Sequence, residues 1–250
     1  MPNPSTPPRR VRFATRYRHL IRCALAAAVL AALAFGAFFV DLAVTRWALA
    51  SRLGVEPAWR IGSDVTDWID LTEVFGHGYG ALMIFLAVFL LDVPGRRFLP
   101  RMIAATATAG IVGNLAKCLI PRIRPRHFLH PLALPETTVW DAFLGPPRWP
   151  GGPNVEAALP SGHTALAVGL AMALAWRYPR GRWYFAFLAA VVAVQRVVSG
   201  NHWLSDTLLG AALAVMVAGA ILYWPWRPPW VPSRTPASPS GANDPELSGD

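Results

Sequence analysis

The chain has few charged residues and almost no lysine. Only 15% of its 250 residues are charged, whereas 54% are hydrophobic, which is far more apolar than a soluble domain of this size requires. Among its 23 Lys and Arg residues, Lys117 is the single lysine. The low charge and high hydrophobicity exclude an ordinary soluble domain and favour a membrane protein.

Cysteine and metal-binding patterns are also scarce. The two cysteines, Cys23 and Cys118, are expected near opposite ends of their membrane segments, so a disulfide between them is not predicted. The six histidines form no HExxH motif or similar helical pair. The sequence therefore predicts no metal site and no cofactor.

Long apolar runs predict an all-α, polytopic membrane bundle of about six transmembrane helices. A run of about 20 apolar residues is long enough to cross the roughly 30 Å hydrocarbon core of a bilayer. Four long candidates and two shorter or more polar ones can be read, in chain order, at about 23–44, 78–93, 102–121, 163–178, 183–199 and 203–224.

Arginine positions predict which ends of these segments face the cytoplasm. Arginines gather in the N-terminal tail, around Arg97 and around Arg180, and cytoplasmic loops carry an excess of Lys and Arg. This distribution accounts for the net charge of +9 without a nucleic-acid partner. An alternative for the first run is a cleaved signal peptide, but the run exceeds the roughly 7–15 apolar residues of such peptides, which favours a retained anchor.

Three regions follow from this pattern. Residues 1–22 form a basic cytoplasmic tail, residues 23–224 a transmembrane domain, and residues 225–250 a tail rich in Pro and Ser that is expected to be disordered. Six segments that start inside would bring three polar clusters to the outer face. In chain order, these clusters are Lys117 with Arg124, then Ser161, Gly162 and His163, then Arg196, His202 and Asp206.

The clusters hold the groups that bind and attack a phosphate. Each group also has a structural explanation, because a basic side chain at a membrane edge can extend to the headgroups and an Asp can stabilise a helix start. Their joint position on one side of the membrane favours a functional over a structural explanation, since ionisable groups at a membrane span are costly. If the segment is helical, Asp206 meets His202 on one face and fixes its tautomer.

The second cluster resembles the start of a helix. Unpaired backbone N–H groups and the positive end of the dipole favour an anion there, and Gly162 lets a phosphate approach closely. Lys117, Arg124 and Arg196 would neutralise phosphoryl oxygens, which is most of what phosphoryl transfer requires of a protein.

The three clusters together resemble the signature of the type 2 phosphatidic acid phosphatase superfamily, which includes vanadium haloperoxidases. Its motifs are K-x6-R-P, P-S-G-H and S-R-x5-H-x3-D. They correspond here to Lys117 through Arg124-Pro125, to Pro160 through His163, and to Arg196, His202 and Asp206. Gln195 replaces the serine of the third motif and keeps a side chain that donates and accepts hydrogen bonds.

The resemblance implies a metal-independent phosphatase that works through a phosphohistidine. His202 would attack phosphorus, Asp206 would orient it, and His163 would protonate the leaving oxygen and then activate water. The phosphate would be held by Lys117, Arg124, Arg196 and the backbone of Ser161 and Gly162. The implied fold is a helical bundle with the site in its core, near the outer membrane surface.

The substrate remains open between several lipid phosphates. Similarity to bacterial members implies a polyprenyl diphosphate, a phosphatidate-like lipid or the phosphate of a lipid A-type glycolipid, in a bacterial inner membrane with the site facing the periplasm. Residues 122–160, which include eight prolines, Trp140 and Trp149, form either a stiff cap or an entrance that selects the lipid.

Other functions are open or disfavoured. A lipid phosphotransferase differs only in its acceptor and is the second candidate. A vanadium haloperoxidase is disfavoured because those proteins resemble soluble proteins, whereas this chain is too apolar. A non-enzymatic membrane protein with a degenerate site is disfavoured because every charged catalytic position is filled.

Overall fold

The computed structural model describes residues 9–53, 63–128, 138–143 and 157–224. Within these ranges the chain is helical, and the β structure there consists of isolated bridges between Arg122 and Phe143 and between Ile123 and Ala157. The prediction of an all-α protein is confirmed. The predicted C-terminal tail, 225–250, and Trp149 lie outside the described residues.

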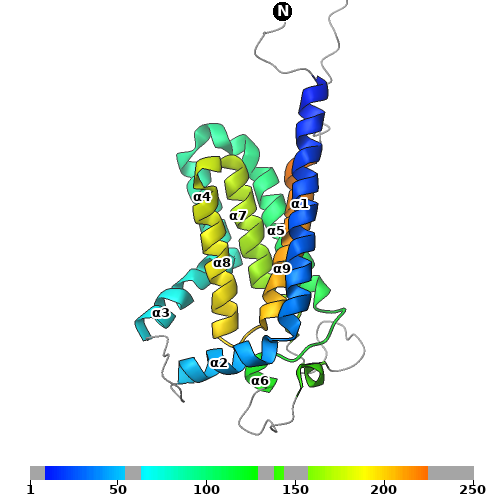
Figure 1. Ribbon diagram of the computed structural model, residues 1–250. Helices are drawn as coiled ribbons and strands as arrows, with labels where there is room; N and C mark the ends of the chain where they lie inside the picture. Colours follow the sequence, from blue (N-terminus) through cyan, green and yellow to red (C-terminus); the bar gives the residue numbers. More distant parts are fainter. Residues whose placement is uncertain (1–8, 54–62, 129–137, 144–156, 225–250) are drawn as a thin grey trace, which may run out of the picture.

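The helices alternate with short 3-10 turns (Figure 1). In chain order they are α1 (Arg9–Phe38), α2 (Asp41–Leu53), α3 (Ser63–Leu71), η1 (Thr72–Gly76), α4 (Gly78–Leu91), η2 (Val93–Phe98), α5 (Leu99–Ala116), α6 (Pro125–Phe128), η3 (Val139–Ala142), α7 (Gly162–Arg177), η4 (Pro179–Gly181), α8 (Arg182–Val198) and α9 (Leu204–Tyr223).

Helix α7 is the centre of the bundle. It packs against α5, α8 and α9, while α1 lies along α9. Small residues allow the close approach of α5 and α7, because a Cβ on Gly113 would lie 2.8 Å from the Cβ of Ala165 and one on Gly169 would lie 2.8 Å from that of Ala109. Small residues are typical of helix interfaces in membranes, where close contact replaces hydrophobic driving force.

The outer surfaces of the bundle are apolar. Leu25 and Leu33 on α1, Leu82 on α4 and Phe187 on α8 are each more than half exposed. Extended apolar surface of this kind indicates contact with lipid rather than water. The chain is a membrane protein by this surface as well as by its composition.

The predicted number of six crossings is not confirmed. By length and hydropathy, the described residues contain three helices able to cross a membrane, Tyr17–Phe38, Pro179–Val198 and Leu204–Tyr223. A fourth crossing is possible if Asp67–Gly76 and Gly78–Leu91, which are bent by 69°, form one span. The six predicted segments nevertheless each correspond to a helix, although α4 and α7 have only 14 and 16 residues.

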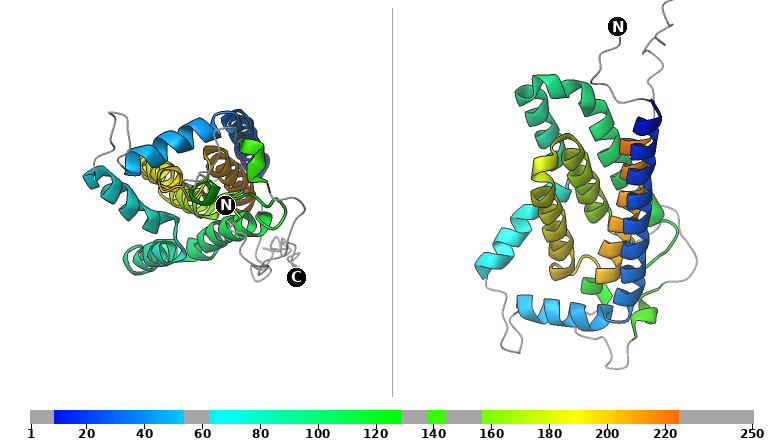
Figure 2. Two further views of the ribbon diagram at one scale, coloured as in Figure 1. Left: turned by 90° about the horizontal axis from the view of Figure 1, so that it is seen from below. Right: turned by 45° about the horizontal axis from the view of Figure 1, so that its top comes forward.

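The first segment differs most from its predicted bounds. Helix α1 already begins at Arg9, within the predicted tail, and ends at Phe38 rather than 44. The chain then turns at Phe39 and Val40, and α2 crosses below the ends of α8 and α9 (Figures 1 and 2). The turn brings the buried carboxylate of Asp41 beneath α9, where it accepts a hydrogen bond from the backbone N–H of Ser205. Both Cys23 and Cys118 are free thiols.

Candidate active site

The predicted site residues come together at one end of the bundle, the lower end in Figure 1. They lie where α5 and α8 end and where α7 and α9 begin. The loops with the arginine-rich sequences, η2 and η4, lie at the opposite end (Figure 1). The bundle thus separates the polar clusters from the arginine-rich turns, as the sequence predicted.

His202 is buried in the turn between α8 and α9. Helix α8 ends at Val198, and two residues later Gly200 has a φ of 67°, in the left-handed region that glycine adopts most readily. The backbone N–H groups of Asn201 and His202 both donate back to the carbonyl oxygen of Arg196. This tight turn places the ring of His202, which is 2% exposed, beneath the end of α8.

The carbonyl of Ala158 sets the tautomer of His202. Nδ1 of His202 lies 2.7 Å from the carbonyl oxygen of Ala158, and a carbonyl can only accept, so Nδ1 carries the proton. Nε2 then keeps its lone pair for attack. Burial lowers the pKa of His202, while the carboxylate of Asp206 raises it; the net lowering favours the neutral, nucleophilic ring.

Asp206 lies beside His202, but its carboxylate oxygens accept hydrogen bonds from other residues. Its Oδ1 accepts from Nη1 of Arg122 at 2.6 Å and its Oδ2 accepts from the backbone N–H of Trp203 at 2.9 Å. The distance from Oδ2 to Nδ1 of His202 is 3.8 Å, which is longer than a hydrogen bond. His202 precedes α9 rather than belonging to it, so the carboxylate acts on the ring by charge, and Ala158 supplies the hydrogen bond.

Arg122 was not singled out from the sequence. It is fully buried and joins Asp206 to Asp41, with Nη2 lying 2.9 Å from Oδ2 of Asp41. Ser205 completes the network, since it accepts from Nη1 of Arg122 at 2.8 Å and donates to Asp41. The guanidinium also lies over three aromatic rings, those of Phe38, Phe143 and Trp203.

Arg122 also holds the backbone around the nucleophile. Its carbonyl accepts from the N–H of Ala158 at 2.8 Å, and Ala158 is the residue whose carbonyl binds His202. The side chain fixes Asp206 and the main chain fixes Ala158. One buried residue is thus connected to both neighbours of the His202 ring.

The P-S-G-H motif starts α7, as predicted. The hydroxyl of Ser161 caps the helix by accepting from the N–H and hydroxyl of Thr164, at 3.4 and 3.0 Å. The N–H of Ser161 donates to the carbonyl of Asp206 at 3.0 Å, so it is occupied in this structure. The first-turn N–H groups of Gly162 and His163 are those that an anion would meet, because such groups have no intrahelical acceptor.

Gly162 also leaves room for a side chain of α5. A Cβ at this position would lie 2.3 Å from Oδ1 of Asn114 on α5, closer than any real contact. The absence of a side chain therefore lets the end of α5, which leads directly to Lys117, approach the start of α7.

The cations of the site surround this helix start. Lys117 is partly buried and lies within electrostatic range of Arg124, Arg196 and Asp206. Arg196 is buried, and its Nη2 lies 2.6 Å from Oε2 of Glu73. The three predicted phosphate-binding cations are thus gathered around the two histidines.

Glu73, like Arg122, was missed by the sequence interpretation. It lies on η1, with its Oε1 3.8 Å from Nε2 of His163. The ring of His77 lies edge-on to that of His163, with centroids 5.3 Å apart. A signal was available in the sequence, since acidic residues recur at every third position, 64, 67, 70 and 73, just before an apolar segment.

Metal ligation finds no support in the described ranges. Among those residues, no group of three or more His, Cys, Asp or Glu side chains is arranged to hold a metal ion.

Two histidines, a carboxylate and three cations thus lie together at one end of a helical membrane bundle. The PAP2 superfamily model matches residues 98–230, more than half of the chain. The chain belongs to this superfamily, which confirms the resemblance read from the three motifs.

One curated relative has a named activity. Over 69 residues, 26% of this chain, the protein is 39% identical to a lipid A 1-phosphatase of Porphyromonas gingivalis. The match covers 15% of that relative's length. No solved structure matches the chain.

Proposed function

We propose that the protein is an integral membrane lipid phosphatase that acts through a phosphohistidine. The observation that carries the proposal is the buried ring of His202, with Nδ1 held 2.7 Å from a carbonyl oxygen and the other nitrogen left as nucleophile among three cations. Membership of the PAP2 superfamily supports the phosphatase class.

The first chemical step transfers the phosphoryl group to His202. Nε2 attacks phosphorus, the N–P bond forms, and the P–O bond to the lipid breaks. The leaving oxygen takes a proton from His163. In the second step His163 removes a proton from water, whose oxygen attacks phosphorus as the N–P bond breaks, and inorganic phosphate is released.

Charge stabilisation is the protein's main contribution to this chemistry. Lys117, Arg124 and Arg196 would bind the phosphoryl oxygens, together with backbone N–H groups at the start of α7. Asp206 would stabilise the positive charge that develops on His202 as its nitrogen attacks. These residues supply the catalytic groups without a metal ion.

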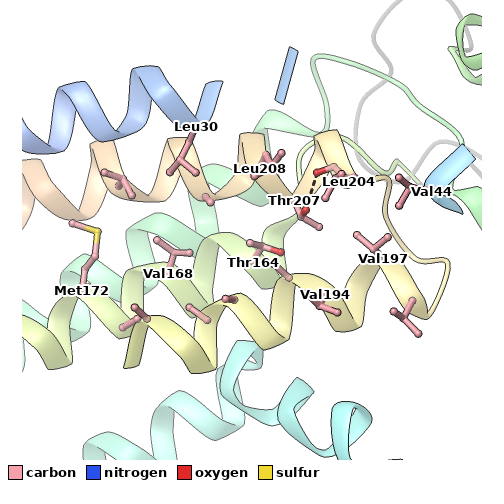
Figure 3. A pocket seen from close by; sticks show the side chains of 18 of the residues that line it. Leu30, Val44, Thr164, Val168, Met172, Val194, Val197, Leu204, Thr207 and Leu208 are labelled. Carbon is pink, nitrogen blue, oxygen red and sulfur yellow. Dashed lines mark hydrogen bonds between the residues drawn. The ribbon is translucent and has the colours of Figure 1, made fainter. Parts of the chain in front are cut away.

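A lipid substrate is supported by an apolar pocket beside the site. The pocket has a volume of about 690 Å³ and lies among α1, α2, α7, α8 and α9 (Figure 3). Its lining is apolar apart from Thr164, Thr207 and Arg182. Thr164 and Thr207 directly follow His163 and Asp206 in the chain, so one end of the pocket lies near the site, although the catalytic side chains are not part of its lining.

The named activity of the curated relative makes a lipid A-type glycolipid phosphate one candidate substrate, beside phosphatidate-like and polyprenyl substrates. The site would face the periplasm from a bacterial inner membrane. Single cysteines at Trp140 and at Arg97, in a background without Cys23 and Cys118, test this topology, because an impermeant reagent should label the first in intact cells and the second only after permeabilisation.

Phosphate release by the purified protein from a panel of lipid phosphates tests the proposed activity. Release should persist in EDTA and be inhibited by vanadate, which can adopt the geometry of the transition state. Strict dependence on added Mg²⁺ would contradict the mechanism. A phosphotransferase would require an added lipid acceptor and would yield a phosphorylated acceptor instead of inorganic phosphate.

A further inference from the structure

A carboxylate lies where the leaving group of the substrate would depart. Glu73 places Oε1 3.8 Å from Nε2 of His163, the proposed acid, and Oε2 2.6 Å from Nη2 of Arg196. Its side chain is 36% exposed, so it borders the open side of the site. A group that receives a proton from Nε2 of His163 would therefore approach Glu73.

Gln195, the residue that departs from the family motif, fixes this carboxylate. Its Nε2 donates to Oε2 of Glu73 at 3.3 Å and to Oδ1 of Asp70 at 2.9 Å, while its Oε1 accepts from Nε of Arg196 at 2.5 Å. A serine side chain has a single oxygen and is too short for this bridging arrangement. The replacement therefore links the end of α8 to the acidic segment of α3 and η1.

The acidic segment also packs closely against the catalytic helix. A Cβ on Gly76 would lie 3.1 Å from the carbonyl oxygen of His163 and 2.7 Å from a methyl group of Val192. The backbone of η1 thus touches α7 at His163 itself. The backbone of η1 packs against α7, and the carboxylate of Glu73 is bound by Gln195 and Arg196. Glu73 therefore has a defined position beside His163, the proposed acid.

We propose that Glu73 makes the site select phosphomonoesters over lipid diphosphates. The inference rests on the proposed function, with His163 as the acid. In a monoester the leaving oxygen belongs to a neutral alcohol, such as a sugar or glycerol hydroxyl, which a carboxylate tolerates or hydrogen-bonds. In a diphosphate the leaving group is itself a phosphate anion, and like charges at this distance repel.

The preference arises at the leaving group rather than at the transferred phosphoryl group. Any weakening of the contact between Glu73 and Arg196 when phosphoryl oxygens bind would be common to both substrates, so it cancels in the ratio of the two rates. Only the diphosphate brings a second negative charge next to the carboxylate. This is selection by an unfavourable contact with the wrong substrate.

The test compares two substrates with the same lipid chain, farnesyl phosphate and farnesyl diphosphate. Wild-type full-length protein in detergent should show a kcat/KM for the monophosphate at least about tenfold higher. Glu73→Gln should reduce this ratio on the order of tenfold, because effects through Arg196 and His163 act on both substrates alike, whereas loss of the repulsion accelerates diphosphate hydrolysis alone. Glu73→Asp, which keeps the charge, should retain the preference, and Asp92→Asn at the opposite end should leave it unchanged.

Two results would overturn the proposal: a wild-type protein without preference for the monophosphate, or a Glu73→Gln variant in which kcat/KM changes by the same factor for both substrates. Failure of the proposed function looks different, because the wild type would then release phosphate from neither substrate, or His202→Ala would release it as fast as wild type. Added salt should lower the ratio of kcat/KM for the monophosphate to kcat/KM for the diphosphate in wild type but not in Glu73→Gln. This result would identify the charge of Glu73 as the cause of the preference.

Discussion

The two ends of the bundle carry charge in different ways. At the site end, Asp41, Arg122 and Asp206 are 0% exposed, and Arg122 binds both carboxylates. At the opposite end, Asp92 and Arg177 form a pair whose side chains are 19% and 26% exposed. Arginines there also lie over aromatic rings, as Arg96 does over Phe89.

The difference bears on the proposed position of the active site. Cations near a membrane surface can keep their charged groups hydrated, and such pairs add little stability. A buried pair must overcome a large desolvation cost and is weak evidence for stability alone. The contrast between buried charges at one end and partly hydrated charges at the other therefore supports the proposed position of the active site.

Removal of the His202 ring should have the largest effect. His202→Ala should lower kcat on the order of a thousandfold or more, because the N–P bond can no longer form at this position. Phosphate release and circular dichroism would separate lost chemistry from lost fold. His19→Ala is the matched control, since that ring stacks on Tyr223 at the opposite end; turnover equal in both variants would remove His202 from this role.

Arg122 offers a way to break the buried network. Arg122→Met should destabilise the protein by about 3–5 kcal/mol, because two buried carboxylates lose their counter-charge. The double variant Arg122→Met with Asp41→Asn removes one of those charges and should recover much of the stability. Thermal unfolding in detergent measures both.

Activity of the double variant separates packing from positioning. If Arg122 holds Asp206 and the backbone of Ala158 in place, kcat should remain low by about a hundredfold despite restored stability, with KM little changed. Recovery of kcat together with stability would show that Arg122 serves the fold alone.

The site residues that could be predicted from the sequence are those whose type and spacing follow from the proposed chemistry. The two histidines, Asp206 and the three cations could be read because each motif lies within a short stretch of chain. Arg122 and Glu73 could not, because their partners are remote: Arg122 binds Asp41 from 81 residues away, and Gln195 binds Glu73 from 122 residues away. Their roles appear only when α2 and η1 pack against the site.

The fold was predictable to a similar extent. Apolar runs indicated the helices, because burial in lipid demands both hydrophobicity and internal hydrogen bonding. Hydropathy continued past Phe38 through Leu42 and Val44, so the turn into α2 was missed. Asp41 interrupts that run, and its role became clear only from Arg122 and Ser205, which bind it.

Lys117 should be sensitive to a change that preserves charge. Lysine is a compact point charge, whereas arginine presents a wide planar group. Lys117→Arg should reduce kcat/KM by about tenfold or more, equivalent to about 1.4 kcal/mol of transition-state stabilisation. Arg180→Lys, an exposed exchange at the opposite end, should have no effect. Full activity of Lys117→Arg would mean that the lysine only reaches toward the headgroups.

The pH dependence should reflect the burial of His202. Burial lowers the pKa of this ring, and only the unprotonated ring attacks, so the acid limb of kcat/KM should lie below the value of about 6.5 for a free imidazole. The carboxylate of Asp206 raises the same pKa, so Asp206→Asn should move the acid limb of the residual activity lower still. Movement to higher pH would contradict this assignment.

The smallest effect should come from the hydrogen bond at the arginine-rich end. The hydroxyl of Tyr178 donates to Oδ2 of Asp92 at 2.8 Å, and Nη2 of Arg177 lies 2.6 Å from the same oxygen. Tyr178→Phe removes one donor while the arginine still neutralises the carboxylate, so the thermal midpoint should fall slightly. Because this group lies at the far end of α7 from His163, kcat/KM should match wild type on every lipid phosphate. A reduced kcat/KM in Tyr178→Phe would show that α7 transmits changes along its length and that the two ends are not independent.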